Sequence, residues 1–309
     1  MMADTVLTVR SPSQETSRVP WILRLLWRDK FAFAGAVFLL VVLFAAIFGP
    51  ALLGKQAVTM NLLARNAPPL SLDKGWLFVL GGDPLGRSLL ARLVVGTQNT
   101  MAIAALTVTM ALTVGCLFGL LAGYVGGIFS AIIMRISDIL MSFPSLLLAL
   151  IVLYVLQPHL ATVVFVLAIT RVPLYLRTIR AEVLEVRERV FVTAARVLGT
   201  SPLRIVFRHI LPVVAPTLIT IATLDVAFVM LSESGLSFLG LGMQAPDITW
   251  GLMIASGQNY LKTAWWLSFW PGLAITLTTM SLNLVANWLR IVADPAQRWR
   301  LETKGMAND

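Results

Sequence analysis

Residues 93–134 read LVVGTQNTMAIAALTVTMALTVGCLFGLLAGYVGGIFSAIIM, and none of these side chains is charged. A helix that crosses a bilayer needs about 20 consecutive apolar residues, so this segment is too long for a single span. Gly123, Gly126 and Gly127 interrupt it, and such a glycine cluster is typical of a tight turn. We therefore expect one span to end at these glycines and another to begin after them.

Further apolar runs lie on both sides of this segment. They are Phe31–Leu53, Ile139–Thr170, in which only His159 is ionisable, and Thr263–Leu289. Only 13% of all residues are charged, whereas about a quarter of the residues of a soluble protein are charged. The chain is therefore expected to lie in a membrane.

The apolar runs add up to six spans. The run Ile132–Thr170 holds two of them, because residues 157–159, Gln-Pro-His, place a polar and helix-breaking step near its middle. A further span is expected from about Leu211 to Leu231. The sequence thus predicts an all-α membrane protein whose six transmembrane helices form one domain over residues 31–292.

The basic residues predict the orientation, because Lys and Arg are retained on the cytoplasmic side of a membrane. A cytoplasmic N-terminus places eighteen of the 24 Lys and Arg residues on that side. The six left outside are Lys55, Arg65, Lys74, Arg87, Arg92 and Lys262. We therefore expect both termini in the cytoplasm, as a tail with an interfacial helix over residues 1–30 and a tail over residues 293–309.

The net charge of +9 is explained by the same distribution, with anionic membrane lipid as the counterpart. No basic stripe with interleaved aromatic residues indicates nucleic acid. The run Phe31–Leu53 exceeds the 7 to 15 apolar residues of a secretory signal, so we expect it to remain as an anchor.

The sequence offers no arranged catalytic, metal or nucleotide site. Residues 49–55 match the phosphate-binding pattern GxxxxGK, but Gln56 replaces the required hydroxyl and the segment ends a membrane span. Cys116 is the only cysteine, and His159 and His209 are expected on opposite sides of the membrane. We expect no enzyme activity, no metal and no cofactor in this chain.

Small residues and buried charges supply the candidates within the spans. Gly115, Gly119, Gly123 and Gly127 recur every four residues and predict close helix packing. Arg135 and Asp138 lie on one helical face and are expected to pair with each other. Charges inside a membrane are costly unless partnered or facing water, which makes Asp225 and Glu233 candidate pathway residues.

About thirty residues, Arg180–His209, separate the fourth and fifth spans, far more than a turn requires. A helix is expected over Glu182–Leu198, with Gly199 as its left-handed C-terminal residue. Ser201 and Pro202 suit the start of a second short helix that ends at His209. The chain would then re-enter the membrane at Leu211-Pro212.

This loop resembles the EAA loop of ABC importer permeases. The similarity lies in Thr193-Ala194-Ala195, in Gly199 after three intervening residues, and in His209-Ile210-Leu211-Pro212 after nine more. In the family the loop forms coupling helices that dock into a cleft of the ATPase subunit. The coupling residues implied are Thr193, Ala194, Ala195, Gly199, Ser201, Pro202, His209, Leu211 and Pro212. Thr193 stands where the family has Glu, and His209 where it has Ile.

Other segments are similar to the C-type permeases of dipeptide and oligopeptide systems. They are Asp83-Pro-Leu-Gly-Arg87-Ser88 with Arg92, Met134-Arg135-Ile-Ser-Asp138 with Ser142-Phe143-Pro144, Ser237-Phe-Leu-Gly-Leu-Gly242 with Trp250-Gly251, and Asp294-Pro295. The similarity covers about residues 20–300. Ser88 replaces a frequent Asp, and Ala286-Asn287 a frequent Gly-Asp.

The resemblance implies a type I ABC importer permease fold in the bacterial inner membrane, with a cytoplasmic coupling-helix loop over about residues 180–212. The implied partners are a second, homologous permease, two ATPase subunits that would bind ATP and Mg²⁺, and an extracytoplasmic binding protein that delivers di- or oligopeptides. Nickel chelates, glutathione or another small solute are alternative cargoes. An ATP-independent secondary transporter would need its own coupling-ion site, for which Asp225 is thin support.

Overall fold

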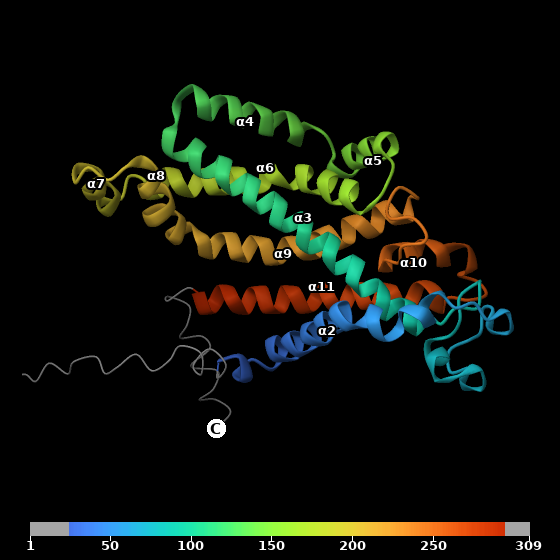
Figure 1. The fold of residues 1–309 in the computed structure, drawn as a ribbon. Helices are drawn as coiled ribbons and strands as arrows, with labels where there is room; N and C mark the ends of the chain where they lie inside the picture. The colour runs from blue at the N-terminus through green and yellow to red at the C-terminus, as the bar shows by residue number, and fades with distance from the viewer. Residues whose placement is uncertain (1–24, 294–309) are drawn as a thin grey trace, which may run out of the picture.

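The computed structural model describes residues 25–293. The two tails predicted from the sequence therefore lie largely outside the described residues. Within that range the α-helical elements labelled in Figure 1 and named below are α2 Lys30–Val58, α3 Leu89–Val125, α4 Gly127–Ser142, α5 Ser145–Leu156, α6 Leu160–Val186, α7 Val190–Val197, α8 Pro202–Arg204, α9 Leu211–Phe238, α10 Trp250–Gly257 and α11 Trp266–Ala293. Short turns of helix complete them: η1 Leu62–Ala64, η2 Leu72–Lys74, η3 Trp76–Leu80, the π-helical η4 Ile205–Ile210 and η5 Gln258–Tyr260.

Among residues 25–293, five helices are long and apolar enough to span a membrane, and α4 with α5 makes a sixth if this bent pair is one span. The two helices of that pair meet at 86°. Pro144 explains the bend, because a proline disfavours helical geometry in the residue before it, and Phe143 is extended with φ −95° and ψ 136°. The expected number of spans is reached only if the bent pair counts as one.

The spans lie side by side in Figure 1, with α3 crossing α6 and α9 obliquely and α2 alongside α11. Helix α3 packs mainly against α6 and α2, and α11 packs against α2, α9 and α10. Two loops mark the ends of this bundle. Residues 187–210, here called the α6–α9 loop, lie at one end. Residues 59–88, the α2–α3 loop, lie with α10 at the other.

The glycines of α3 allow its close approach to α6. A Cβ atom on Gly119 would lie 2.8 Å from the carbonyl oxygen of Leu176, and one on Gly123 would lie 2.7 Å from Cβ of Val183. Gly115 meets α6 in the same way. These three packing predictions are confirmed, whereas Gly127 has no neighbour within 4 Å and a φ of +58°. Gly127 serves the turn into α4, because a side chain there would be strained.

The predicted pairing of Arg135 with Asp138 is wrong. Asp138 is ion-paired with Arg177 of α6, which also donates from Nε to the hydroxyl of Ser137 at 3.2 Å. Arg180, three residues further along the same face of α6, donates to Ser130 at 2.8 Å. The packing of α4 against α6 thus brings Arg177 to Asp138, which pairs with it and not with Arg135 on its own helix.

Helix α3 begins at Leu89, directly after the α2–α3 loop. Ser88 is its N-cap, since its hydroxyl accepts a hydrogen bond from the amide of Ala91 at 3.1 Å. Residues 82–88 form a tight turn around the Asp83 carboxylate, which accepts from the backbone amides of Leu85 and Arg87.

Candidate functional site

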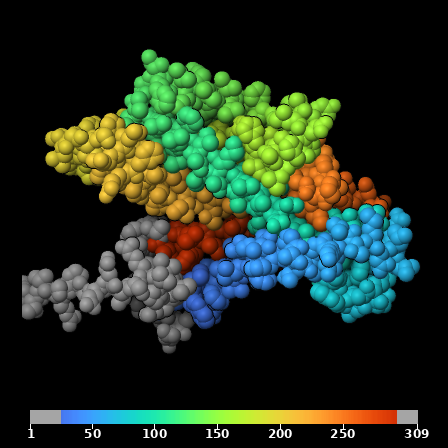
Figure 2. Space-filling model, viewed as in Figure 1, coloured from blue at the N-terminus to red at the C-terminus, as the bar shows by residue number. Residues whose placement is uncertain are grey.

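The α6–α9 loop projects from one end of the bundle (Figure 2). The single helix expected over Glu182–Leu198 is wrong, because α6 ends at Val186 and α7 starts anew at Val190. Arg189, at the N-cap position of α7, is extended with φ −71° and ψ 147°. The break turns the apolar face of α7 back onto the bundle, and this burial overrides the helical preference of the sequence.

The end of α7 confirms the expectation for Gly199. Its φ is +77°, and its amide donates to the carbonyl of Arg196 at 3.0 Å. The amide of Thr200 donates to the carbonyl of Ala195 at 3.0 Å. These two bonds form a Schellman motif, in which a glycine is favoured because the left-handed residue carries no Cβ.

The second half of the loop was expected to be a separate short helix. Ser201 and Pro202 do begin a helix, with Pro202 at its first position, but the helix then runs without a break from Pro202 to Phe238. Residues 205–210 form a π-helical turn, and the amide of Leu211 donates to the carbonyl of Val206. Pro212 has no amide hydrogen, so the wider turn absorbs the lost helical bond where a break was expected.

One face of the loop is buried and the other is free. Val192 is 0% and Ala195 8% exposed, and they pack in one cluster with Ile205, Val206 and Ile210. The opposite face carries large apolar side chains that water surrounds in the isolated chain. These are Val190, Val197, Leu198 and Leu203, with exposed fractions from 64% to 85%.

The predicted coupling residues divide between these faces. Thr193, Ala194, Gly199, Ser201, Pro202 and Pro212 are exposed, His209 and Leu211 are half-buried, and Ala195 is buried. Small exposed residues beside large apolar ones allow another protein to approach the backbone closely. Exposed apolar patches of this kind mark interaction sites.

Two contacts that the sequence did not predict tie this loop to the end of α3. Arg187 donates from Nη1 to the carbonyl oxygen of Gly123 at 2.9 Å. The guanidinium of Arg196 lies 5.9 Å from the ring centroid of Tyr124. A cation at a helix C-terminus is favourable, because the last carbonyls are unpaired and the helix dipole is negative there. The loop is therefore held by three helices, α3, α6 and α9.

Asp225 has the polar partner that its position in the fifth span required. It is 2% exposed, forms an ion pair with Arg171 of α6, and accepts a hydrogen bond from the hydroxyl of Tyr175 at 3.0 Å. The Arg171 guanidinium also lies 4.0 Å above the ring of Phe228. The cluster locks α6 to α9 at mid-span, and its pathway role stays a prediction.

Glu233 lies in a second buried cluster. Its Oε1 accepts hydrogen bonds from the hydroxyls of Ser237 at 2.8 Å and Thr249 at 3.0 Å. Thr249 is also the N-cap of α10, and the amide of Trp250 donates to Thr100 of α3 at 3.0 Å. Glu233 thus helps to hold α10 against α9 and α3 in this conformation. Its pathway role, too, stays a prediction.

The partners of Asp225 and Asp138 were missed because they lie more than thirty residues away in sequence. One signal was available for the α4 contacts. Ser130 and Ser137 are seven residues apart, and Arg177 and Arg180 three apart, so each pair lies on one helical face. Within the part of the chain that the structure describes, no group of three or more His, Cys, Asp or Glu residues could hold a metal ion.

Comparison with known proteins gives consistent matches. A family model described as "Binding-protein-dependent transport system inner membrane component" matches residues 115–299. The di/tripeptide transport system permease protein DppC of Pseudomonas aeruginosa (strain UCBPP-PA14) is 38% identical, over 92% of this chain and 96% of that protein. The nickel transport system permease protein NikC of Escherichia coli (strain K12) is 37% identical, over 70% of this chain and 78% of that protein.

A solved structure shares the fold. The methionine ABC transporter MetNI in inward-facing conformations superimposes with a TM-score of 0.56, over 67% of this chain and 98% of that chain. The sequences are 17% identical, so this likeness concerns the fold alone.

Proposed function

Because the chain belongs to the family of inner-membrane components of binding-protein-dependent transport systems, we propose that it is a permease subunit whose α6–α9 loop couples an ATP-driven importer to its ATPase. The fold is the all-α type I permease fold that the sequence predicted. The chemistry of ATP hydrolysis, with its Mg²⁺, belongs in this proposal to partner subunits.

The observation that carries the proposal is the free face of the α6–α9 loop. Its apolar side chains Val197, Leu198 and Leu203 are more than 60% exposed although the loop itself is tightly fixed to three helices. A rigid apolar projection suits docking into a cleft, because little conformational entropy is lost on binding. ATP-driven closure of two ATPase subunits would move this loop and, through α6 and α9, the membrane pathway.

The basic residues support a cytoplasmic position for the loop. Eight of the 24 Lys and Arg residues lie between Arg171 and Arg208, and cytoplasmic segments are enriched in them. The α2–α3 loop and α10 then face outward, where a binding protein would deliver the cargo. A second, homologous permease would complete the pathway.

Peptides are the first cargo to test, because permeases of di- and tripeptide systems match nearly the whole chain. A nickel chelate is the second candidate cargo, because a nickel permease is similar to this chain at a comparable sequence identity. Uptake of a labelled dipeptide by cells that carry the complete transporter, in competition with unlabelled dipeptide or nickel chelate, separates the two cargoes. Peptide transport is contradicted if these cells take up no labelled dipeptide.

Gly199 provides the test of coupling. A side chain added there meets no atom within 4 Å, so Gly199→Val acts through backbone strain at φ +77° and not through a clash. Gly199→Asn is the matched control, since Asn tolerates the left-handed conformation. We expect the Val variant to insert normally but to lose co-purifying ATPase and coupled uptake, while the Asn variant keeps both. Full coupling in the Val variant would contradict the docking role.

A further inference from the structure

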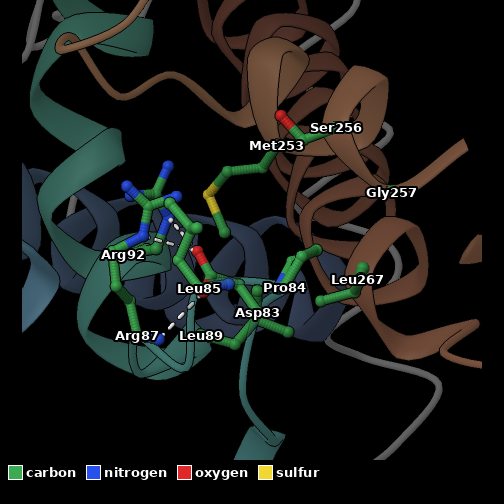
Figure 3. A pocket seen from close by; sticks show the side chains of 10 residues that line it. All are labelled: Asp83, Pro84, Leu85, Arg87, Leu89, Arg92, Met253, Ser256, Gly257 and Leu267. Carbon is green, nitrogen blue, oxygen red and sulfur yellow. Dashed lines mark hydrogen bonds and ion pairs between the residues drawn. The ribbon is translucent and has the colours of Figure 1, made fainter. Parts of the chain in front are cut away.

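A pocket with uneven charge opens beside the start of α3, at the end of the bundle opposite the α6–α9 loop. Its volume is about 200 Å³, and Figure 3 shows that its lining comes from the α2–α3 loop, α3, α10 and α11. The charged members are Asp83, Arg87 and Arg92. Two guanidinium groups therefore face one carboxylate, which leaves one positive charge in excess.

The carboxylate is already fully engaged by other groups. Asp83 accepts from the amides of Leu85 at 2.9 Å and Arg87 at 2.8 Å through Oδ1, and from Nε of Arg87 at 2.6 Å through Oδ2. Nε of Arg92 lies 3.6 Å from the same Oδ2, beyond the length of a good hydrogen bond. The Asp83–Arg87 pair is therefore self-sufficient.

Arg92 has weaker partners than Arg87, since its ion pair with Asp83 is 3.6 Å long and includes no hydrogen bond. Only 7% of it is exposed, and its hydrogen bond from Nη1 to the carbonyl of Ala57 is 3.5 Å long. A guanidinium carries five N–H donors, and a buried charge is costly unless it is paired and hydrogen-bonded. A buried arginine so placed at the wall of a pocket predicts an anion in that pocket.

The rest of the pocket is apolar and open on one side. Leu89, Met253 and Leu267 are buried and form its inner wall, while Leu85 and Ser256 are exposed at its mouth. In Figure 3 the side chain of Met253 extends from α10 toward the charged residues. An apolar cavity of about 150 Å³ is already large enough to bind benzene, so this one accommodates roughly one amino-acid residue.

We propose that this pocket binds the C-terminal residue of a peptide, with the terminal carboxylate on Arg92 and the side chain against Met253 and Leu267. The inference rests on the proposed function for the outward orientation of the pocket and for peptide as cargo. Beyond that function, the pocket would let the permease itself recognise the C-terminal end of the peptide. A C-terminal residue combines the carboxylate and the apolar body that the two halves of the pocket select, whereas an acidic side chain of a docked protein would bring the charge alone.

The test measures binding to the full-length chain in phosphatidylcholine nanodiscs by ligand-observed NMR. The probe is N-acetyl-leucine, and N-acetyl-leucinamide is the same molecule without the carboxylate. We expect the acid to bind and the amide to bind at least tenfold more weakly. No ATPase or binding protein is present in this assay, so a lack of probe binding says nothing about the coupling role of the α6–α9 loop. Likewise, a negative result for the Gly199 variants says nothing about binding in this pocket.

Three variants assign the binding to the pocket. Arg92→Met keeps the length of the side chain and removes its charge. The matched control is Arg65→Gln, which removes an exposed charge from the neighbouring α2–α3 loop. Ser256→Trp blocks the mouth and leaves Arg92 in place, which covers the case that the Arg92 variant does not fold. We expect at least tenfold weaker binding in the Met and Trp variants and no change in the control.

Equal binding of acid and amide, or of wild type, Arg92→Met and Ser256→Trp, would overturn the proposal. So would the absence of any binding by the wild-type chain. If the probe does not bind but Arg92→Met weakens association of the binding protein, the occupant is an acidic side chain of that partner and the peptide assignment is wrong.

Discussion

Replacing Asp225 by Asn removes the charge at the centre of the buried cluster and nearly preserves its shape. The carboxylate has the Arg171 guanidinium on one side and the Tyr175 hydroxyl, 3.0 Å away, on the other. The amide can still accept one hydrogen bond, but it leaves the guanidinium without a counter-charge. We therefore expect the variant to be destabilised, chiefly because the charge of Arg171 is then unpaired.

The size of the effect follows from burial. Breaking a buried ion pair by removing one partner costs about 3–5 kcal/mol. The Arg171 side chain is 19% exposed, so water partly solvates its charge. We therefore expect the free energy of unfolding to fall by about 3 kcal/mol, the lower end of that range. The double variant Arg171→Leu, Asp225→Leu removes both charges and should lie within about 1 kcal/mol of the wild type.

The free energy of unfolding is measured by titrating SDS into mixed micelles and following helicity by circular dichroism. Glu185→Gln is the matched control, because its ion pair with Arg189 is exposed and should contribute at most about 0.5 kcal/mol. Unchanged stability of Asp225→Asn would refute the reasoning. So would a double variant that is less stable than the single one.

The remaining predictions concern a glycine in each of α3 and α9, and the contact between the α6–α9 loop and α3. Gly119→Val should lower the free energy of unfolding by about 1–3 kcal/mol, because its Cβ would lie 2.8 Å from the carbonyl oxygen of Leu176. Gly235→Ala, in a helix with nothing within 4 Å of the added atom, should be neutral or stabilising in the same SDS titration. Arg187→Gln should speed amide hydrogen exchange in the last turn of α3 by about fivefold, since it loses a bond of about 1 kcal/mol to the carbonyl of Gly123; unchanged exchange there would contradict the proposed link between loop and helix.

The spans were predictable because their signal is local. Twenty apolar residues without charge identify a membrane helix whatever surrounds it, and the glycines at positions 115, 119 and 123 show by their spacing that a helix packs there. Gly199 was equally predictable, because its left-handed role depends only on the helix that it ends.

The partners of charged residues were not predictable, because they depend on which helices meet. Asp138 has an arginine three residues away on its own helix, yet it pairs with Arg177 across a packed interface. The break between α6 and α7 has the same origin. Burial of Val192 and Ala195 against η4 outweighs the helical preference of residues 187–189.

The most direct test of the account is site-specific cross-linking of the α6–α9 loop to the ATPase in the assembled transporter. Cys116 is the only cysteine, so Cys116→Ala gives a cysteine-free background. Leu198→Cys places a photo-reactive label on the loop, and Leu63→Cys places one at an equally exposed position on the α2–α3 loop, the two leucines being 83% and 86% exposed. We predict that the ATPase is cross-linked from residue 198 and not from residue 63; no cross-link from residue 198, or equal cross-linking from both, would contradict the coupling role.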